Sequence, residues 1–249
     1  MWSSMQVRPG VVLGFTDTTA GNLAFHVGDD PSLVAKRRVA VEHALAHGVG
    51  APPAHATTLA YMEQVHGADV AVLDAGAQTP TPTADAMVVT LDVGTEAGLA
   101  VMVADCVPVL LLGEAPRGKM VLAVAHAGRP GVEKGVITAV ADQMRRSGAL
   151  AIEAWLGPSV CGRCYEVPDA MREAVAAQVP ESWSTTTAGT PGLDLPAAVL
   201  AQLAASGVEA HPSGICTLED ERYYSHRRSQ RDGVDEGRFI GFIVASAPA

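Results

Sequence analysis

Short apolar runs rich in β-branched residues alternate along this chain with alanine-rich stretches of helical spacing. The apolar runs predict strands at 11–16, 57–63, 85–90, 98–104, 109–112 and 119–126. The alanine-rich stretches predict helices at 31–47, 132–146, 168–178 and 195–205. In the first helix, Pro31 is suited to the first turn and Gly48 to the end. Alternation of this kind is typical of the α/β class.

The connections between these segments indicate a single domain over residues 1–249. A turn is predicted at Thr19–Asn22, and residues 183–192 are the best candidate for a loop. No linker, internal repeat or low-complexity segment divides the chain. The most apolar region, 98–113, is interrupted by Asp105 and Pro108, so no membrane-spanning helix is expected.

Composition and charge narrow the functional class. Seventeen Lys and Arg residues against 27 Asp and Glu residues give a net charge of −10. This acidic balance argues against nucleic-acid binding, which usually requires a basic surface. The apolar fraction of 48% excludes a disordered chain. Four cysteines without a visible signal peptide do not suggest a disulfide framework, and we expect a cytoplasmic protein with no membrane partner.

Common catalytic signatures are missing from the sequence. It contains no glycine-rich dinucleotide or Walker loop and no H-E-x-x-H motif. The segment Gly157-Pro-Ser-Val-Cys161 lacks the last glycine of a nucleophile elbow. No histidine is followed by x-Glu, which excludes the usual zinc deaminase signature.

Three potential metal ligands follow predicted strands at positions that favour tight turns. His66, Cys106 and His126 each lie at or just past a strand end, beside Gly or Pro. Strand ends in α/β proteins project into a shared crevice, so these side chains can converge there. Two imidazoles and one thiolate suit Zn²⁺ and leave one coordination position open. The alternative from spacing alone is a buried core cysteine with two surface histidines.

An ordered set of short motifs resembles the YfiH family, once labelled multicopper polyphenol oxidases and now described as purine nucleoside phosphorylases. The resemblance spans about residues 11–243. The motifs, in chain order, are Asn22-Leu, His26-Val-Gly-Asp-Asp30, Gln64-Val-His-Gly67, Ala84-Asp-Ala86, Ala104-Asp-Cys-Val-Pro108, Ala125-His-Ala-Gly128, Gly157-Pro-Ser159, Cys164-Tyr-Glu-Val167, Tyr224-Ser-His-Arg-Arg228 and Gly237-Arg238.

The resemblance implies a layered α/β sandwich with mixed β-sheets and a zinc site built from His66, Cys106 and His126. It also implies phosphorolysis of adenosine, inosine and 5′-methylthioadenosine, with adenosine deamination at the same site. The expected partners are therefore a purine nucleoside and phosphate, and the expected assembly is a monomer or homodimer. Copper is an alternative occupant because its affinity for N/S ligands is higher.

Phosphorolysis requires cationic side chains that bind phosphate and polar side chains that form hydrogen bonds with the ribose hydroxyls. The candidates for phosphate are Arg38, Arg227, Arg228 and Arg238, because a guanidinium donates two parallel hydrogen bonds. Asn22 is the candidate for a sugar hydroxyl, with a turn as its alternative role. Asp105 is expected to orient a ligand or transfer a proton, or else to stabilise the turn before Pro108.

Some positions depart from the family pattern or receive no role. The family often has Trp-Arg after His-Ala-Gly, whereas this chain has Arg129-Pro130, and Arg37 stands where Asn is frequent. Cys161 and Cys164 have redox-like spacing without thioredoxin context, and are interpreted as structural or wall residues. Tyr165 and Glu166 match a family motif but have no assigned role. Cys216 and His211 are interpreted as structural.

Two competing functions stay open at this point. A multicopper laccase needs paired H-x-H motifs, and none of the eight histidines forms one. A non-catalytic zinc-containing binding protein would be favoured by a fourth protein ligand, because closed tetrahedral sites are usually structural.

Overall fold

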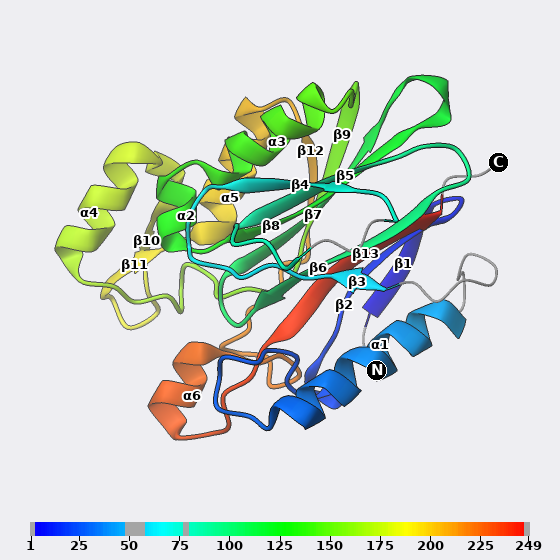
Figure 1. Cartoon of the computed structure of the whole chain (residues 1–249). Coiled ribbons are helices and arrows are strands. Elements are labelled where there is room, and N and C mark those ends of the chain that lie inside the picture. Colours follow the sequence, from blue (N-terminus) through cyan, green and yellow to red (C-terminus); the bar gives the residue numbers. More distant parts are fainter. Residues whose placement is uncertain (1–2, 48–57, 77–79, 247–249) are drawn as a thin grey trace.

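Two β-sheets packed face to face, with helices on their outer faces, make up the computed structural model (Figure 1). It describes residues 3–47, 58–76 and 80–246. The predicted layered α/β sandwich with mixed sheets is confirmed. Among the described residues, no helix is long and apolar enough to cross a membrane. The single-domain interpretation stays a prediction.

The first sheet has five strands and joins the two ends of the chain. Their order is β1 (Ser3–Arg8), β2 (Val11–Phe15), β13 (Phe239–Ser246), β6 (Glu96–Val103) and β3 (Leu59–Ala60). Neighbouring strands are antiparallel except β3, which is parallel to β6. The strand β13 lies in the middle, so residues near the carboxyl end complete a sheet begun near the amino end.

The second sheet has six strands. Their order is β12 (Glu209–Pro212), β9 (Ala151–Leu156), β7 (Val107–Glu114), β8 (Met120–Ala127), β5 (Ala86–Leu91) and β4 (Val70–Asp74). The outer pairs β12/β9 and β4/β5 are parallel and the inner pairs are antiparallel. The chain passes from the first sheet to the second after β3 and again after β6, and it returns after β5 and after β12.

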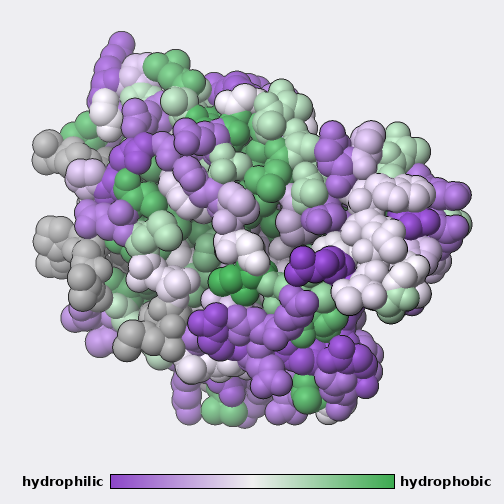
Figure 2. Space-filling view, turned by 180° about the vertical axis from the view of Figure 1, so that it is seen from behind, coloured by the Kyte–Doolittle hydropathy of each residue, from purple (hydrophilic) through white to green (hydrophobic). Residues whose placement is uncertain are grey.

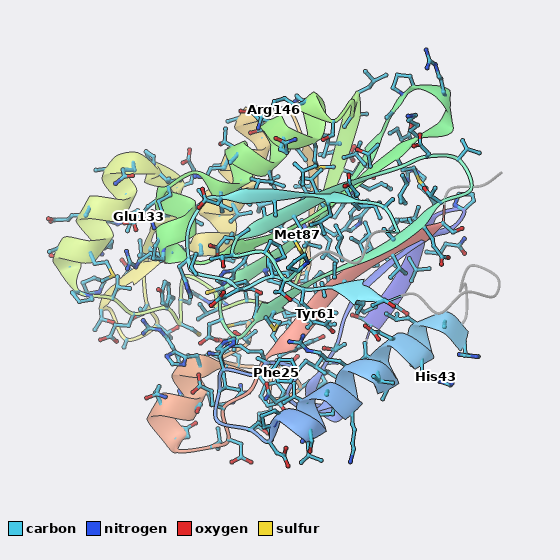
Figure 3. The ribbon with its side chains drawn as sticks, viewed as in Figure 1. Phe25, His43, Tyr61, Met87, Glu133 and Arg146 are labelled. Atoms are coloured by element: carbon cyan, nitrogen blue, oxygen red, sulfur yellow. The ribbon has the colours of Figure 1, made fainter. Side chains whose placement is uncertain are left out.

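Both faces of the central strands are buried, which explains their nearly continuous apolar sequence. In β7, Leu110 and Leu112 point toward the other sheet, whereas Val109 and Leu111 point toward helices. Met87 from β5 is fully buried between the sheets (Figure 3). The alternation of side chains along each strand therefore serves two cores at once.

Helices cover the outer face of each sheet (Figure 1). The long helix α1 (Pro31–His47) packs on the five-stranded sheet through Val41 and Leu45. The outer face of the six-stranded sheet is covered by α3 (Val136–Arg146) and α5 (Leu195–Ala205). Two further helices, α4 (Asp169–Gln178) and α6 (His226–Asp232), lie toward one end of the molecule.

Most predicted elements are present, with some shifts in their bounds. The strands predicted at 11–16, 85–90, 98–104, 109–112 and 119–126 correspond to β2, β5, β6, β7 and β8, and the helices at 31–47, 168–178 and 195–205 to α1, α4 and α5. The turn predicted at Thr19–Asn22 overlaps a short 3₁₀ helix, Thr18–Ala20, which ends at Gly21. The strand predicted at 57–63 is only β3, and residue 57 and Gly48 lie outside the described residues.

Two predictions were wrong, and several elements were missed. The helix predicted at 132–146 is divided into α2 (Arg129–Glu133) and α3, because Gly135 adopts a left-handed conformation with φ of 79°. The predicted loop 183–192 contains a hairpin of β10 (Trp183–Thr185) and β11 (Pro191–Leu193). The sequence analysis missed the elements β1, β4, β9, β12, α6 and β13.

The packing between the sheets predicts a large cost for removing a central side chain. Leu110 is fully buried there, so Leu110→Ala is expected to reduce the free energy of unfolding by about 2–5 kcal/mol. The control Leu150→Ala removes a leucine that is 79% exposed, and should change it by less than about 0.5 kcal/mol. Urea denaturation measures both, and equal effects would contradict the described core.

Candidate metal centre and its cavity

Two connections between the sheets and one strand bring His66, Cys106 and His126 together. His66 lies in the loop after β3, Cys106 in the crossing from β6 to β7, and His126 near the end of β8. One ligand atom from each lies within 4.8 Å of the other two. The Cys106 Sγ and His66 Nε2 are 3.8 Å apart, and the two imidazoles meet edge to face. The structure thus gathers the three residues that the resemblance implies as ligands.

A buried carboxylate, Asp85, fixes both histidines. Its Oδ1 is 2.8 Å from His126 Nδ1 and accepts a hydrogen bond from the His66 amide at 2.9 Å. Its Oδ2 accepts from the amides of Val65 and Gly67 at 3.2 and 2.5 Å. This network supports the left-handed conformation of His66, whose φ is 58°. Because Nδ1 of His126 faces Asp85, its Nε2 is the nitrogen left for a metal.

The three donors also influence one another electrostatically. Burial opposes the charged thiolate, but the neighbouring imidazoles, His126 first, lower the pKa of Cys106 to about 6. Burial likewise opposes the imidazolium, yet the Cys106 sulfur and the Asp85 carboxylate raise the pKa of His126 to about 9. A thiolate is therefore accessible at neutral pH, which is the form of cysteine that binds metals.

The donor set fits a borderline-soft metal such as Zn²⁺ or Cu²⁺. Two imidazoles and a thiolate suit these ions and disfavour Mg²⁺ and Ca²⁺. Across the described ranges, no fourth His, Cys, Asp or Glu joins this group. A three-donor site leaves a position for water or substrate, as in catalytic zinc sites. Gly128 permits this close approach, because a Cβ there would lie 2.7 Å from His66 Cδ2 and 3.1 Å from Cys106 Sγ.

The metal centre opens into a cavity of about 420 Å³. Apolar walls come from Met102, Val160 and Leu195, and the aromatic ring of Tyr165 closes another side. The remaining lining includes many groups that donate or accept hydrogen bonds: His26, Gln64, Asp105, Arg129, His226, Arg227 and Arg238. The cavity therefore combines apolar surface, a candidate metal centre and several cations.

Arginine side chains make the cavity cationic. Arg227 lies over the Tyr165 ring at 4.3 Å and makes no ion pair within the part of the chain that the structure describes. Arg129 pairs with Glu133 at 2.7 Å, and Arg238 with Glu236 at 2.8 Å. Glu133 and Glu236 partly balance the charges of Arg129 and Arg238. Arg227 is therefore the strongest candidate for binding an anion.

Asp105 and Asn22 hold the backbones of these arginines. The Asp105 carboxylate accepts from the Arg227 amide at 2.8 Å and from Thr217 Oγ1 at 2.7 Å. The Asn22 Oδ1 accepts from the Arg238 amide at 2.9 Å, and its Nδ2 donates to the Ala24 carbonyl. Asp105 lines the cavity, whereas Asn22 is buried outside its lining. Both side chains thus position residues that line the site.

Two predicted phosphate ligands lie away from the cavity lining. Arg38 donates to the Leu23 carbonyl at 2.8 Å and stacks on Phe25 and Tyr61, which lie above the first half of α1 (Figure 3). Arg228 donates to the Thr217 carbonyl at 2.6 Å and to that of Tyr223. Arg37 pairs with Asp29. Their guanidinium groups hold loops, and the structure does not bring Arg38 or Arg228 to the other candidates.

Sequence reasoning assigned no role to several residues of the site. Asp85, His26 and His226 all stood inside the matched motifs, which was the available signal. The Gln64 side-chain amide donates to the Met102 carbonyl at 2.7 Å and accepts from the Met102 amide at 2.9 Å. These two hydrogen bonds fix the loop that carries His66. His226 Nδ1 lies 2.8 Å from Glu236, and burial together with Arg238 lowers the pKa of His26.

The sequence of this chain is similar to a family model and to several named proteins. A family model described as multi-copper polyphenol oxidoreductase laccase matches residues 8–246. A protein named purine nucleoside phosphorylase from Streptomyces griseus is 46% identical, covering 89% of this chain and 85% of its own. Another from Streptomyces coelicolor is 44% identical, covering 94% and 95%.

The crystal structure of the hypothetical protein YfiH from Bacillus licheniformis has the same fold. The two structures superpose with a TM-score of 0.78 at 22% identity, over 98% of this chain and 99% of the other. The expected resemblance is confirmed by these comparisons.

The Asp85 network predicts weaker metal binding when its charge is removed. Asp85→Asn turns a carboxylate that receives three backbone amides into an amide, which misorients His66 and His126. We expect Zn²⁺ affinity to fall about 10–100-fold, measured by competition with a chromogenic chelator. Asp74→Asn, at an exposed strand end, should bind like the unmodified protein. Equal affinities for both variants would show that Asp85 does not organise the centre.

Proposed function

The chain belongs to the multi-copper polyphenol oxidoreductase laccase family, and we propose that it is a zinc-dependent purine nucleoside phosphorylase. Relatives with that name, 44–46% identical, support an enzyme of this kind. The proposed substrates are adenosine, inosine and 5′-methylthioadenosine, cleaved by phosphate to the free base and the ribose 1-phosphate or methylthioribose 1-phosphate. Deamination of adenosine to inosine is proposed as a second activity of the same site.

The observation that carries this proposal is one cavity lined both by the three candidate metal donors and by Arg227, which has no ion pair with the residues that the structure describes. Phosphorolysis proceeds through an oxocarbenium-like sugar, with phosphate attacking as the base leaves. Arg227 offers a planar pair of donors for phosphate, and Tyr165 beneath it fixes the guanidinium plane. Asp105 holds the Arg227 backbone, so the cation is already oriented before phosphate binds.

The rest of the cavity suits a nucleoside. Its volume of about 420 Å³ lies in the range of small-molecule sites. Met102, Val160 and Leu195 offer apolar surface for a purine ring. His226, whose Nδ1 is held by Glu236, has Nε2 free of that contact for proton transfer to the leaving base.

His66, Cys106 and His126 are the residues that would hold the metal. When bound, Zn²⁺ supplies a Lewis acid that stabilises negative charge on the substrate or lowers the pKa of water. Asp85 keeps the two imidazoles oriented. The chain's own contribution is therefore orientation of the nucleoside, the phosphate and one proton donor.

The family description suggests copper oxidation as the competing function. A multicopper cluster requires many imidazoles close together, but in the described part of the chain this cavity gathers two histidines and one cysteine as a metal-binding group. A non-catalytic binding protein is the third hypothesis. A three-donor centre argues against it, because a closed site with four protein donors is typical of structural zinc.

A product assay on protein of known zinc content tests the proposal. Adenosine is supplied with and without phosphate, and products are separated by chromatography. We expect adenine and ribose 1-phosphate only with phosphate, in proportion to bound zinc. Inosine formed without phosphate would show the deaminase activity alone. Oxidation of a phenolic substrate by copper-loaded protein, with no nucleoside cleavage, would instead support the oxidase.

The role of Arg227 yields a separate prediction. A charge-assisted hydrogen bond contributes about 1.5–3 kcal/mol, so Arg227→Ala should lower kcat/KM for phosphate roughly 10–100-fold. Arg231→Ala is the matched control, because Arg231 is an exposed arginine of the same helix, paired with its neighbour Asp232. Steady-state kinetics at varied phosphate measures both. An equal, small effect in the two variants would place phosphate elsewhere.

A further inference from the structure

A second group of metal-binding side chains lies apart from the three donors of the cavity. It consists of Cys161, Cys164, Cys216 and Glu219, whose sulfur and carboxylate atoms all lie within 4.8 Å of one another. Cys216 is buried, Cys161 and Cys164 are partly buried, and Glu219 is exposed. This cluster uses three of the four cysteines of the chain.

The backbone builds this cluster from two segments that are distant in sequence. The turn at Cys161–Cys164 closes through the amides of Cys164 and Tyr165, which donate to the Cys161 carbonyl at 2.9 and 3.0 Å. A parallel bridge between Ser159 and Cys216 brings the second segment alongside. These contacts place two sulfurs of a C-x-x-C turn against a third sulfur.

Backbone amides surround the Cys216 sulfur, while burial raises the pKa of its thiol. The Cys161 amide donates to Cys216 Sγ at 3.4 Å, and the amides of Leu218 and Glu219 also face this sulfur. Backbone N–H groups directed at a sulfur stabilise its negative charge, as they do around ligating cysteines. The Glu219 amide also donates to the Cys216 carbonyl at 3.2 Å, which turns the Glu219 side chain back toward the sulfurs.

We propose that these four residues form a second, structural metal site that binds Zn²⁺ through three thiolates and one carboxylate. Four protein donors make a closed tetrahedral site, in contrast to the three-donor centre of the cavity. With Zn–S bonds of about 2.3 Å, tetrahedral sulfurs lie about 3.8 Å apart. This separation falls within the 4.8 Å limit that encloses the four ligand atoms here. Binding releases the thiol protons to solvent and involves no change of oxidation state.

A disulfide would explain fewer of the four clustered side chains than a metal ion does. One disulfide uses two of the three sulfurs and leaves a thiol and the Glu219 carboxylate beside it without a role. All four groups are ligands of the kind that zinc accepts, in the number that it requires. The site is therefore assigned to a metal, and the disulfide is the competing outcome of the experiment.

This metal would fasten two segments that build the cationic side of the cavity. Tyr165, which follows Cys164, supports the Arg227 guanidinium. Thr217, which follows Cys216, donates to the Asp105 carboxylate that also holds the Arg227 backbone. The Arg228 guanidinium donates a hydrogen bond to the Thr217 carbonyl of the same loop. The proposed ion thus supports the shape of the cavity from outside it, and the proposal does not depend on phosphorolysis.

Metal analysis of paired variants separates the two centres. Zinc per chain is measured by mass spectrometry after purification under reducing conditions, for the unmodified protein, Cys106→Ser, Cys164→Ser and the double variant. We expect two ions, one, one and none. Co²⁺ substitution of Cys106→Ser should show thiolate-to-metal charge-transfer absorption that disappears in the double variant. Cys164→Ser with unchanged zinc content, in either background, would overturn the proposal.

A measurement on the unmodified chain guards against variants that fail to fold. Thiol alkylation followed by peptide mass analysis is run on zinc-loaded protein with and without a chelator. The proposal predicts that Cys161, Cys164 and Cys216 are protected until zinc is removed. Equal labelling under both conditions, or a Cys161–Cys164 disulfide in the zinc-loaded protein, would contradict it.

Discussion

The buried carboxylate of Asp85 is the interaction on which the site depends. An ionised side chain with no solvent exposure is costly unless every lone pair is used, and here three backbone amides and one imidazole use them. The same contacts hold His66 in a left-handed conformation and fix the orientation of His126. The hydrogen bonds that the buried Asp85 carboxylate requires therefore also orient His66 and His126, which come from different elements.

The two-sheet architecture determines where such a centre can form. The chain crosses from β6 to β7 through Cys106, and the preceding Asp105 adopts a left-handed conformation with φ of 81° in this tight connection. Segments from both ends of the chain then close the cavity, as in the hydrogen bond from the Arg238 amide to Asn22. Polar side chains gather on the side of α6, at the lower right of the space-filling view (Figure 2). Arg238 directly precedes the central strand β13, so this strand helps to place one of the cations of the cavity.

The sequence predicted the helices and strands whose own residues carry a clear apolar or capping pattern. Helix α1 follows from Pro31 and its spacing, and the buried strands from apolar runs such as Val107–Glu114. The edge strands β1 and β12 were missed because most of their residues are exposed and the apolar pattern is weak. The convergence of His66, Cys106 and His126 was suggested by strand ends, but choosing it over a core cysteine needed the family motifs. The functions of Arg227 and Arg228 could not be separated by sequence, because neighbouring side chains on a short helix point to different surroundings.

The account rests on an open metal centre that faces the cation of Arg227 across one cavity. A crystal structure of zinc-loaded protein with phosphate, recorded at the zinc absorption edge, tests this most directly. The anomalous map should show an ion bonded to His66, Cys106 and His126 with no fourth protein ligand, and phosphate should lie on the Arg227 side chain. An ion closed by a fourth protein donor, or phosphate bound away from Arg227, would contradict the account.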